Sequence, residues 1–186
     1  MSQRVKVWDL PTRIFHWTLV ALTLATFASG FEGGNWIEWH GRLGLAIVGL
    51  IVFRLVWGII GSTYARFAQF IPGPRRIRAY LRGQWHGLGH NPLGAFSVLG
   101  LLALMSFQLA SGLIADDSIS FTGPLKDLVS QRVSDLFTGL HRQNIWLIMG
   151  LVSLHVASIV FYRLVKKDDL LTPMITGTKK TDDPAA

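Results

Sequence analysis

Four long apolar runs dominate the pattern of hydrophobic and polar positions along the chain. They cover residues 12–30, 40–61, 92–115 and 140–165, and each contains only a few polar residues. An α-helix needs roughly 20 apolar residues to cross the hydrocarbon core of a bilayer, and each run is about that long or longer. The pattern therefore predicts an all-α membrane protein built as a bundle of four transmembrane helices.

The segments between the runs are polar enough to lie at the membrane surface. An arginine-rich stretch, YARFAQFIPGPRRIRAYLRGQWHG, separates the second and third runs, and Asn91 followed by Pro92 predicts the start of the third helix. Residues 123–141 place apolar side chains at helical spacing, which predicts a short interfacial helix or a docking surface. We expect residues 1–167 to form the membrane domain and residues 168–186 to form a short, mobile cytoplasmic tail.

The composition supports a membrane protein and excludes several classes of redox site. Hydrophobic residues make up 50% of the 186 residues, charged residues make up 16%, and there is no cysteine. Disulfides, thiolate-ligated iron–sulfur clusters and c-type haem attachment are thereby excluded. We expect the first run to stay in the membrane rather than act as a cleaved signal peptide, because a histidine, His16, lies within it.

Lysine and arginine are distributed unequally over the two predicted sides of the membrane. If both termini are cytoplasmic, 14 of the 18 basic residues lie on the cytoplasmic side, and only Arg42, Lys126, Arg132 and Arg142 lie outside. The positive-inside rule favours this orientation. Topology thus explains the net charge of +7, and we expect no nucleic-acid partner.

Four histidines lie within or at the ends of the predicted helices, at two depths. His155 follows His141 by 14 residues, and such a step along an α-helix advances about 21 Å while returning to nearly the same face. His40 and His141 begin their helices at the outer surface, whereas His16 lies 14 residues before Gly30, the outer end of the first helix. His16 and His155 should therefore share the inner level, and His40 and His141 the outer one.

Two facing histidine pairs favour a metal whose two axial positions are both filled by the protein. Ionisable residues inside a membrane are costly and mark function by default. A tetrahedral zinc site would need four ligands together, so haem iron fits the pattern best. The pattern predicts two bis-histidine b haems, one near each membrane face. For each histidine alone, an interhelical hydrogen bond or an interfacial position is the alternative.

Arginines near these levels are candidates for binding the haem propionates. Arg54 follows His40 by 14 residues, so the same helical arithmetic places it at the inner level on the interior face. A guanidinium can bind a carboxylate through two parallel hydrogen bonds. Arg13, Arg42 and Arg142 each lie within three residues of a candidate ligand. The alternatives are snorkelling to the surface for Arg54 and ordinary flanking charges for the other three.

These residues also make the chain similar to a known family. It contains RIFHW, then EWHGRLG with Arg54 downstream, then LHRQNIWLIMGLVSLHVASIVFYR. The three stretches resemble the prokaryotic cytochrome b561 family, which shares its dihaem core with the cytochrome b subunits of nickel–iron hydrogenases. The resemblance covers residues 5 to about 167. It implies that His16 and His155 ligate one haem and that His40 and His141 ligate the other.

The resemblance implies a multi-pass protein of the bacterial inner membrane that transfers electrons. Family members pass electrons between the quinone pool and a periplasmic partner, for which a c-type cytochrome is our expectation here. One alternative is a superoxide:quinone oxidoreductase, which would need a positive outer pocket from Arg42, Arg132 and Arg142. Another is the cytochrome b anchor of a larger oxidoreductase such as a hydrogenase. A third is a non-redox anchor or transporter, and a homodimer is left open.

Three polar residues have less definite roles. His86 and His90 lie four residues apart, but the glycines around them disfavour a helical metal site. We expect both to be cytoplasmic interfacial residues. A more specific hypothesis is that they exchange protons with quinone. Gln108, in the third run, is expected to bond another helix, or else a haem or a quinone carbonyl.

Overall fold

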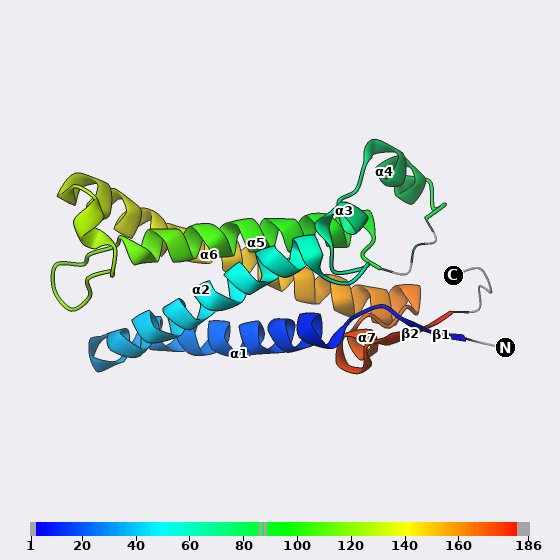
Figure 1. The fold of residues 1–186 in the computed structure, drawn as a ribbon, viewed down its shortest axis with the longest axis horizontal. Coiled ribbons are helices and arrows are strands. Elements are labelled where there is room, and N and C mark those ends of the chain that lie inside the picture. Colours follow the sequence, from blue (N-terminus) through cyan, green and yellow to red (C-terminus); the bar gives the residue numbers. More distant parts are fainter. Residues whose placement is uncertain (1–2, 86, 88, 182–186) are drawn as a thin grey trace. The chain divides into compact units, whose positions relative to one another are not determined.

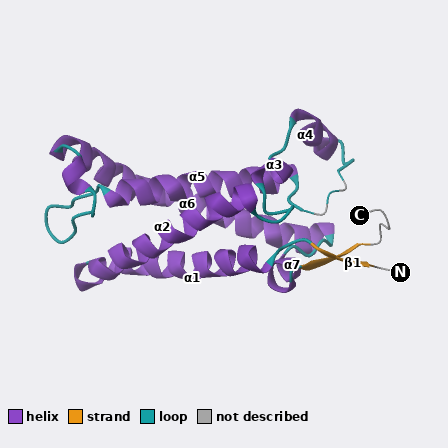
Figure 2. Cartoon of the chain, viewed as in Figure 1, coloured by secondary structure: helices purple, strands orange, loops and turns teal. Residues whose placement is uncertain are grey.

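The computed structural model describes residues 3–85, 87 and 89–181, and most of them are helical (Figure 2). Within these residues four helices are long and apolar enough to span a membrane (Figure 1). They are α1 (Leu10–Glu32), α2 (Ile37–Ile60, after a 3-10 turn at Gly34–Trp36), α5 (Pro92–Leu113) and α6 (Gln131–Phe161, before a π-helical turn at Tyr162–Lys166). The prediction of four membrane-length helices is confirmed.

Two of these helices begin at side-chain caps. Asp9 precedes α1, and its Oδ1 accepts a hydrogen bond of 2.7 Å from the backbone N–H of Thr12. Asn91 precedes α5, and its Oδ1 accepts one of 2.7 Å from the N–H of Gly94. Each bond satisfies an N–H group that the first helical turn leaves unpaired. Pro92 opens α5 at a position that needs no donor, so the predicted start of this helix is confirmed.

The surfaces of the long helices carry large apolar side chains. Leu24, Ile59, Leu147 and Val165 are each more than half exposed. Polar residues, by contrast, are among the buried ones, and these include Thr26, Ser29, Arg54, Ser111, Ser134 and Asn144. This distribution is typical of helices that present apolar surface to lipid and satisfy their polar groups against one another.

Shorter elements connect the long helices. Between α2 and α5 lie α3 (Phe67–Phe70) and α4 (Pro74–Leu81), and α4 carries three exposed arginines. Between α5 and α6, Asp116 pairs with Thr122 in an isolated bridge, and a 3-10 turn follows at Lys126–Leu128. The prediction of a separate interfacial helix before residue 140 is wrong. The helical pattern of residues 131–140 continues in phase with that of the span, so both belong to α6.

The two ends of the chain pair with each other. β1 (Gln3–Lys6) and β2 (Thr178–Thr181) form an antiparallel two-stranded sheet, with Lys6 opposite Thr178 (Figure 1). A short helix, α7 (Leu171–Thr176), comes directly before β2. The segment expected to be a mobile tail therefore has regular structure up to residue 181, and residues 182–186 of that tail lie outside the described residues.

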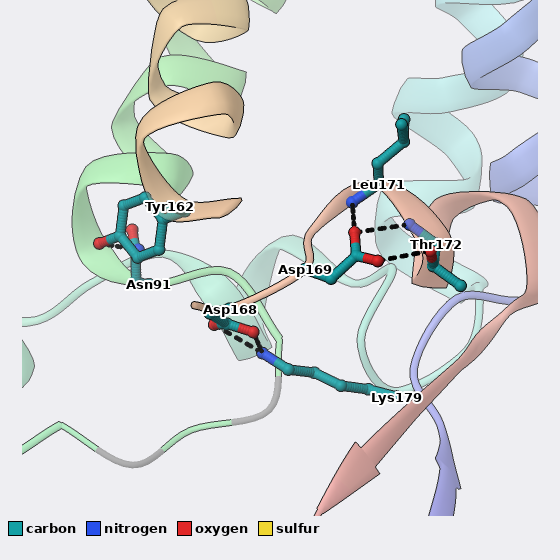
Figure 3. Close-up of polar contacts among 7 residues, drawn as sticks. All are labelled: Asn91, Tyr162, Asp168, Asp169, Leu171, Thr172 and Lys179. Atoms are coloured by element: carbon teal, nitrogen blue, oxygen red, sulfur yellow. Dashed lines mark hydrogen bonds and ion pairs between the residues drawn. The ribbon is translucent and has the colours of Figure 1, made fainter. Parts of the chain in front are cut away.

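Polar contacts explain why this C-terminal segment is ordered (Figure 3). Asp169 caps α7, because its Oδ1 accepts hydrogen bonds of 3.0 and 3.1 Å from the N–H groups of Leu171 and Thr172. Lys179 in β2 forms an ion pair of 2.8 Å with Asp168. The cap and the ion pair hold the chain close to the end of α6.

The chain divides into two compact units. The first, which we call the His16 unit, comprises Met1–His16, Arg54–Gly100 and Val152–Ala186. The second, the His141 unit, comprises Trp17–Phe53 and Leu101–Leu151. Each of the four long helices contributes residues to both units. His16 and His155 fall in the first unit, and His40 and His141 fall in the second, so each predicted pair lies within one unit.

Candidate functional site

In the His141 unit, α2 and α6 bring two histidines face to face. The ring centroids of His40 and His141 lie 6.0 Å apart, and the ring planes are inclined at 81°. Both side chains are half-buried. The structure thus brings together the two histidines that the sequence predicts as one pair.

The Nδ1 atom of each of these histidines contacts a backbone carbonyl. Nδ1 of His40 lies 2.9 Å from the carbonyl oxygen of Thr26 in α1, and Nδ1 of His141 lies 2.9 Å from that of Gln108 in α5. A carbonyl oxygen only accepts, so each Nδ1 carries the proton and donates it. A neutral imidazole in this tautomer has its lone pair on Nε2, the form in which histidine binds a metal.

Two glycines make room for these imidazoles. A Cβ atom on Gly30 would lie 2.7 Å from Nδ1 of His40, and one on Gly112 would lie 2.9 Å from Cε1 of His141. Real Cβ atoms do not approach other atoms so closely, so any larger residue would displace the ring. The histidines therefore pack directly against the backbones of α1 and α5.

Hydrogen bonds between α5 and α6 hold His141 in place. The side-chain amide of Gln108 donates to the backbone carbonyl of His141 at 3.1 Å. The buried Asn144 donates to Oε1 of Gln108 at 2.9 Å and to the carbonyl of Leu104 at 3.0 Å. The prediction that Gln108 bonds another helix is confirmed.

In the His16 unit, Arg54, His16 and His155 each interact electrostatically with His90. His16 on α1 and His155 on α6 are half-buried. Burial, and then electrostatic interactions with Arg54, His155 and His16, lower the pKa of His90 to about 4, so His90 is neutral at physiological pH. These electrostatic interactions connect His90 with both histidines of the predicted inner pair and with Arg54.

His90 lies between two aromatic rings. Its ring centroid is 4.6 Å from that of Trp8 and 5.0 Å from that of Phe70. Its Nδ1 is buried and has no hydrogen-bond partner within the described part of the chain. His86, which we expected to accompany it at the interface, lies outside the described residues.

Arg54 is buried, with only 4% of its surface exposed. Its guanidinium lies over the ring of Phe67, 4.8 Å from the centroid, and 5.9 Å from that of Phe70. Nη1 is buried and has no hydrogen-bond partner among the described residues. A buried guanidinium with a spare donor fits a carboxylate ligand, which is the group that a haem propionate supplies.

The other three candidate arginines lie in different surroundings. Nη1 of Arg13 donates to the backbone carbonyl of Ile175 at the end of α7. Arg42 pairs with Glu38 at 2.5 Å, and both side chains are largely exposed. Arg142 is exposed on α6. Of the four candidates, Arg54 alone combines deep burial with a donor that lacks a partner within the described residues.

The donor chemistry fits haem in both units. The described residues contain no group of three or more His, Cys, Asp or Glu side chains that could hold a metal ion. Two imidazoles can ligate an iron whose other positions a macrocycle fills. Two features of the His141 unit suit that ligand set: the Nδ1 atoms that donate to carbonyls, and the glycines against which the imidazoles pack. In the His16 unit, the buried Arg54 suits it.

Comparison with known proteins decides the family. The family model described as prokaryotic cytochrome b561 matches residues 7–177. The chain belongs to the prokaryotic cytochrome b561 family. As a member of this family, it is a multi-pass membrane cytochrome b of the bacterial inner membrane, with haem b as its cofactor and electron transfer as its activity.

Curated relatives of this cytochrome b561 family member span nearly its whole length. A probable Ni/Fe-hydrogenase 1 B-type cytochrome subunit of Escherichia coli (strain K12) is 20% identical, over 92% of this chain and 88% of the relative. Probable Ni/Fe-hydrogenase B-type cytochrome subunits of Rhizobium leguminosarum bv. viciae and Azotobacter vinelandii are 22% and 23% identical, over 97% and 96% of this chain and 91% and 90% of the relatives. No solved structure matches the chain significantly.

Sequence reasoning did not find several residues of the candidate site. The carbonyl of Thr26 and the hydroxyl of Ser111 contact the histidine Nδ1 atoms, Ser29 donates to the carbonyl of Thr26, and Asn144 donates to Gln108. Small polar residues are common in membrane helices, so none of them stands out alone. The available signal is a short repeated sequence that contains both serines.

Proposed function

We propose that this cytochrome b561 family member carries single electrons between membrane quinone and a periplasmic redox partner through two bis-histidine b haems. His16 and His155 would hold one haem, and His40 and His141 the other. Each haem, when bound, supplies an iron that takes up and releases one electron. The protein's own residues orient that iron, neutralise its propionates and insulate it from water.

One observation carries this proposal. His40 and His141 face each other across 6.0 Å with both Nδ1 atoms donating to carbonyls, so their Nε2 atoms are available as metal ligands. His16, His155 and Arg54 belong to the other unit, and each interacts electrostatically with His90 there, which supports a second pair. Two separate histidine pairs support two haems more directly than they support two sets of interhelical hydrogen bonds.

A pocket in the His16 unit supports quinone as the membrane substrate. The pocket has a volume of about 300 Å³, and Tyr64, Phe70, Trp85 and His90 are among the residues that line it. Aromatic walls with a few polar groups suit a flat, weakly polar ring such as a quinone headgroup. We propose that quinone exchanges electrons with the adjacent haem here. Proton exchange through His90 stays a prediction.

The periplasmic partner has two competing identities. A soluble c-type cytochrome is our expectation from the sequence. The curated relatives are named as probable Ni/Fe-hydrogenase cytochrome subunits, which favours the anchor of a larger redox enzyme as the second candidate. Co-purification of the tagged protein from its native membrane separates them, because an anchor subunit retains its enzyme in stoichiometric amount. Superoxide-driven quinone reduction well above background would instead identify a superoxide oxidase.

Haem stoichiometry in alanine variants tests the ligand pairs. We expect the wild-type protein to bind two haems, and His16→Ala, His155→Ala, His40→Ala and His141→Ala each to bind one. The double variant His40→Ala/His141→Ala should still bind one haem, whereas His16→Ala/His40→Ala should bind none. Pyridine haemochrome absorbance against protein concentration measures these numbers.

The comparison of double variants decides the pairing. If His16→Ala/His155→Ala binds no haem while His16→Ala/His40→Ala binds one, the proposed pairs are wrong. If wild-type protein prepared with haem available binds none, the electron-transfer function fails altogether.

A further inference from the structure

Two five-residue segments of the spanning helices share their last three residues, ASG. Residues 26–30 in α1 read TFASG, and residues 108–112 in α5 read QLASG. Both segments belong to the His141 unit, and each packs against one histidine of the pair there. We call these segments the TFASG socket and the QLASG socket.

The first residue of each socket supplies the carbonyl that receives the imidazole. Thr26 accepts from Nδ1 of His40, and Gln108 accepts from Nδ1 of His141, both at 2.9 Å. The two contacts involve the same atoms at the same distance, although one histidine lies on α2 and the other on α6.

The fourth residue of each socket is a buried serine that donates to the same carbonyl. Oγ of Ser29 lies 3.0 Å from the carbonyl oxygen of Thr26, and Oγ of Ser111 lies 2.9 Å from that of Gln108. Oγ of Ser111 also lies 3.1 Å from Nδ1 of His141. In each socket, therefore, the histidine shares its acceptor with a hydroxyl group.

The fifth residue of each socket is the glycine against which the ring packs. A Cβ atom on Gly30 would meet His40 at 2.7 Å, and one on Gly112 would meet His141 at 2.9 Å. Gly44 and Gly150 on the neighbouring helices have open space where a Cβ would stand. Space thus requires glycine at the sockets, whereas it does not at Gly44 and Gly150.

We propose that the TFASG and QLASG sockets are two copies of one histidine-positioning device, which fixes the two histidines that would hold a single haem and would thereby tune its midpoint potential. The proposal rests on the function proposed above, in which His40 and His141 ligate the same iron. Ser29, Ser111 and the two glycines act through the histidines and are positioning residues.

The shared carbonyl gives the serines a predictable effect on potential. A hydroxyl that donates to the carbonyl weakens that oxygen as an acceptor for Nδ1–H. When the serine is removed, the imidazole donates more strongly and becomes a more basic ligand. A more basic axial ligand stabilises the oxidised iron, so the midpoint potential should fall.

Serine variants test this tuning. We expect Ser29→Ala and Ser111→Ala to bind two haems and to lower the midpoint potential of one haem, with a larger fall in the double variant. The other haem should keep its wild-type potential. Ser158→Ala is the matched control, because Ser158 makes the same kind of bond, 2.8 Å to the carbonyl of Leu154, outside the sockets. Redox titration that resolves the two haems measures the shifts.

Glycine variants test the positioning independently of potential. Gly30→Ala and Gly112→Ala should each displace a ring, so we expect about half of the wild-type haem content and loss of the electron paramagnetic resonance signal of one haem. Gly150→Ala, in open space, should keep both haems. Retention of the other haem's signal shows that the glycine variants have folded.

The outcomes separate this proposal from the one it rests on. Suppose that wild-type protein binds two haems, that the serine variants have the same midpoint potentials as Ser158→Ala, and that the glycine variants keep both haems. The proposal about the sockets is then wrong, whereas the proposed function is unaffected. The same holds if the two serine variants shift different haems. If wild-type protein binds no haem, both proposals fail.

Discussion

Asp9 is a single buried carboxylate that joins three parts of the His16 unit. Besides capping α1, it accepts a hydrogen bond of 3.0 Å from Nε1 of Trp57 and a further one from Oγ of Ser62. Burial alone would raise the pKa of Asp9, but the hydrogen bonds from Ser62, Thr12 and Trp57 outweigh it and hold the pKa below the ordinary value of 3.8. Asp9 therefore stabilises the fold in its charged form.

The pH dependence of Asp9→Asn follows from this lowered pKa. A carboxylate whose folded-state pKa is depressed stabilises the protein above its unfolded-state pKa and loses that effect as the pH falls through the folded value. At pH 7 we expect the variant to be less stable by about 1–3 kcal/mol, the range for hydrogen bonds to charged groups. The difference should shrink as the pH falls below 3.8 and through the lowered folded-state pKa, because wild-type Asp9 also becomes neutral. Thermal unfolding in detergent at pH 7 and in a series of acidic buffers measures it.

A matched substitution controls for the loss of a negative charge. Asp127 is exposed, so Asp127→Asn should change stability little at any of these pH values. A destabilisation by Asp9→Asn that stays constant over the whole acidic series would contradict the role given to the ionised carboxylate.

At the residue scale, the sequence predicts candidate residues for the site but not the groups that surround them. Histidines and Arg54 stand out in apolar runs because burying them has a large cost, and helical spacing then sorts them by level. Asp9 was missed because it stands just outside the first run. The serines and glycines of the sockets were missed because their role depends on which carbonyl and which ring they meet, and that depends on tertiary packing.

At the scale of elements, α5 and α6 are joined by a polar clamp in the His141 unit. The clamp consists of Gln108, which donates to the carbonyl of His141, and Asn144, which donates to Gln108. Ser134 continues the same contact by donating to the carbonyl of Ile114 at 2.8 Å. Because two of these bonds involve the backbone, they fix the register of the two helices and not only side-chain positions.

Gln108→Leu keeps the size of the side chain and removes the clamp. Interhelical hydrogen bonds in membrane proteins contribute roughly 0.6 kcal/mol each and up to about 1.7. We expect a loss of about 1–2 kcal/mol, since two bonds are lost and Asn144 keeps only its bond to Leu104. Thermal unfolding in detergent measures the change. Gln143→Leu, at an exposed position of α6, is the control, and equal effects of the two variants would show that the clamp adds nothing.

The elements that the sequence did not predict are the ones without a local signal. Apolar runs and the Asn91–Pro92 start define the long helices, because helix formation in a membrane depends on nearby residues. β1 and β2 are four residues each, and their pairing joins Lys6 to Thr178 across almost the whole chain. A four-residue polar strand gains stability only from its partner, so no window of sequence around either one identifies it.

At the scale of the whole molecule, the orientation in the membrane decides which connections between helices face each side of the bilayer. The unequal distribution of lysine and arginine predicts that both termini and the connection between α2 and α5 face the cytoplasm. The connection between α5 and α6, which carries Asp116 and Asp117, would then face the periplasm. In that orientation, the acidic connection would be available to a basic periplasmic protein, and the pocket lined by His90 would belong to the cytoplasmic half of the protein.

Single-cysteine labelling tests this orientation directly, because the chain contains no cysteine of its own. Ile119 is 93% exposed in the α5–α6 connection, and Gln84 is exposed in the α2–α5 connection. In spheroplasts, a membrane-impermeant maleimide should label Ile119→Cys and leave Gln84→Cys unlabelled, while inverted vesicles should give the opposite result. Both variants should react after detergent solubilisation, which controls for thiol reactivity. Labelling of Gln84→Cys in intact spheroplasts would reverse the topology, and with it the assignment of quinone to the cytoplasmic half.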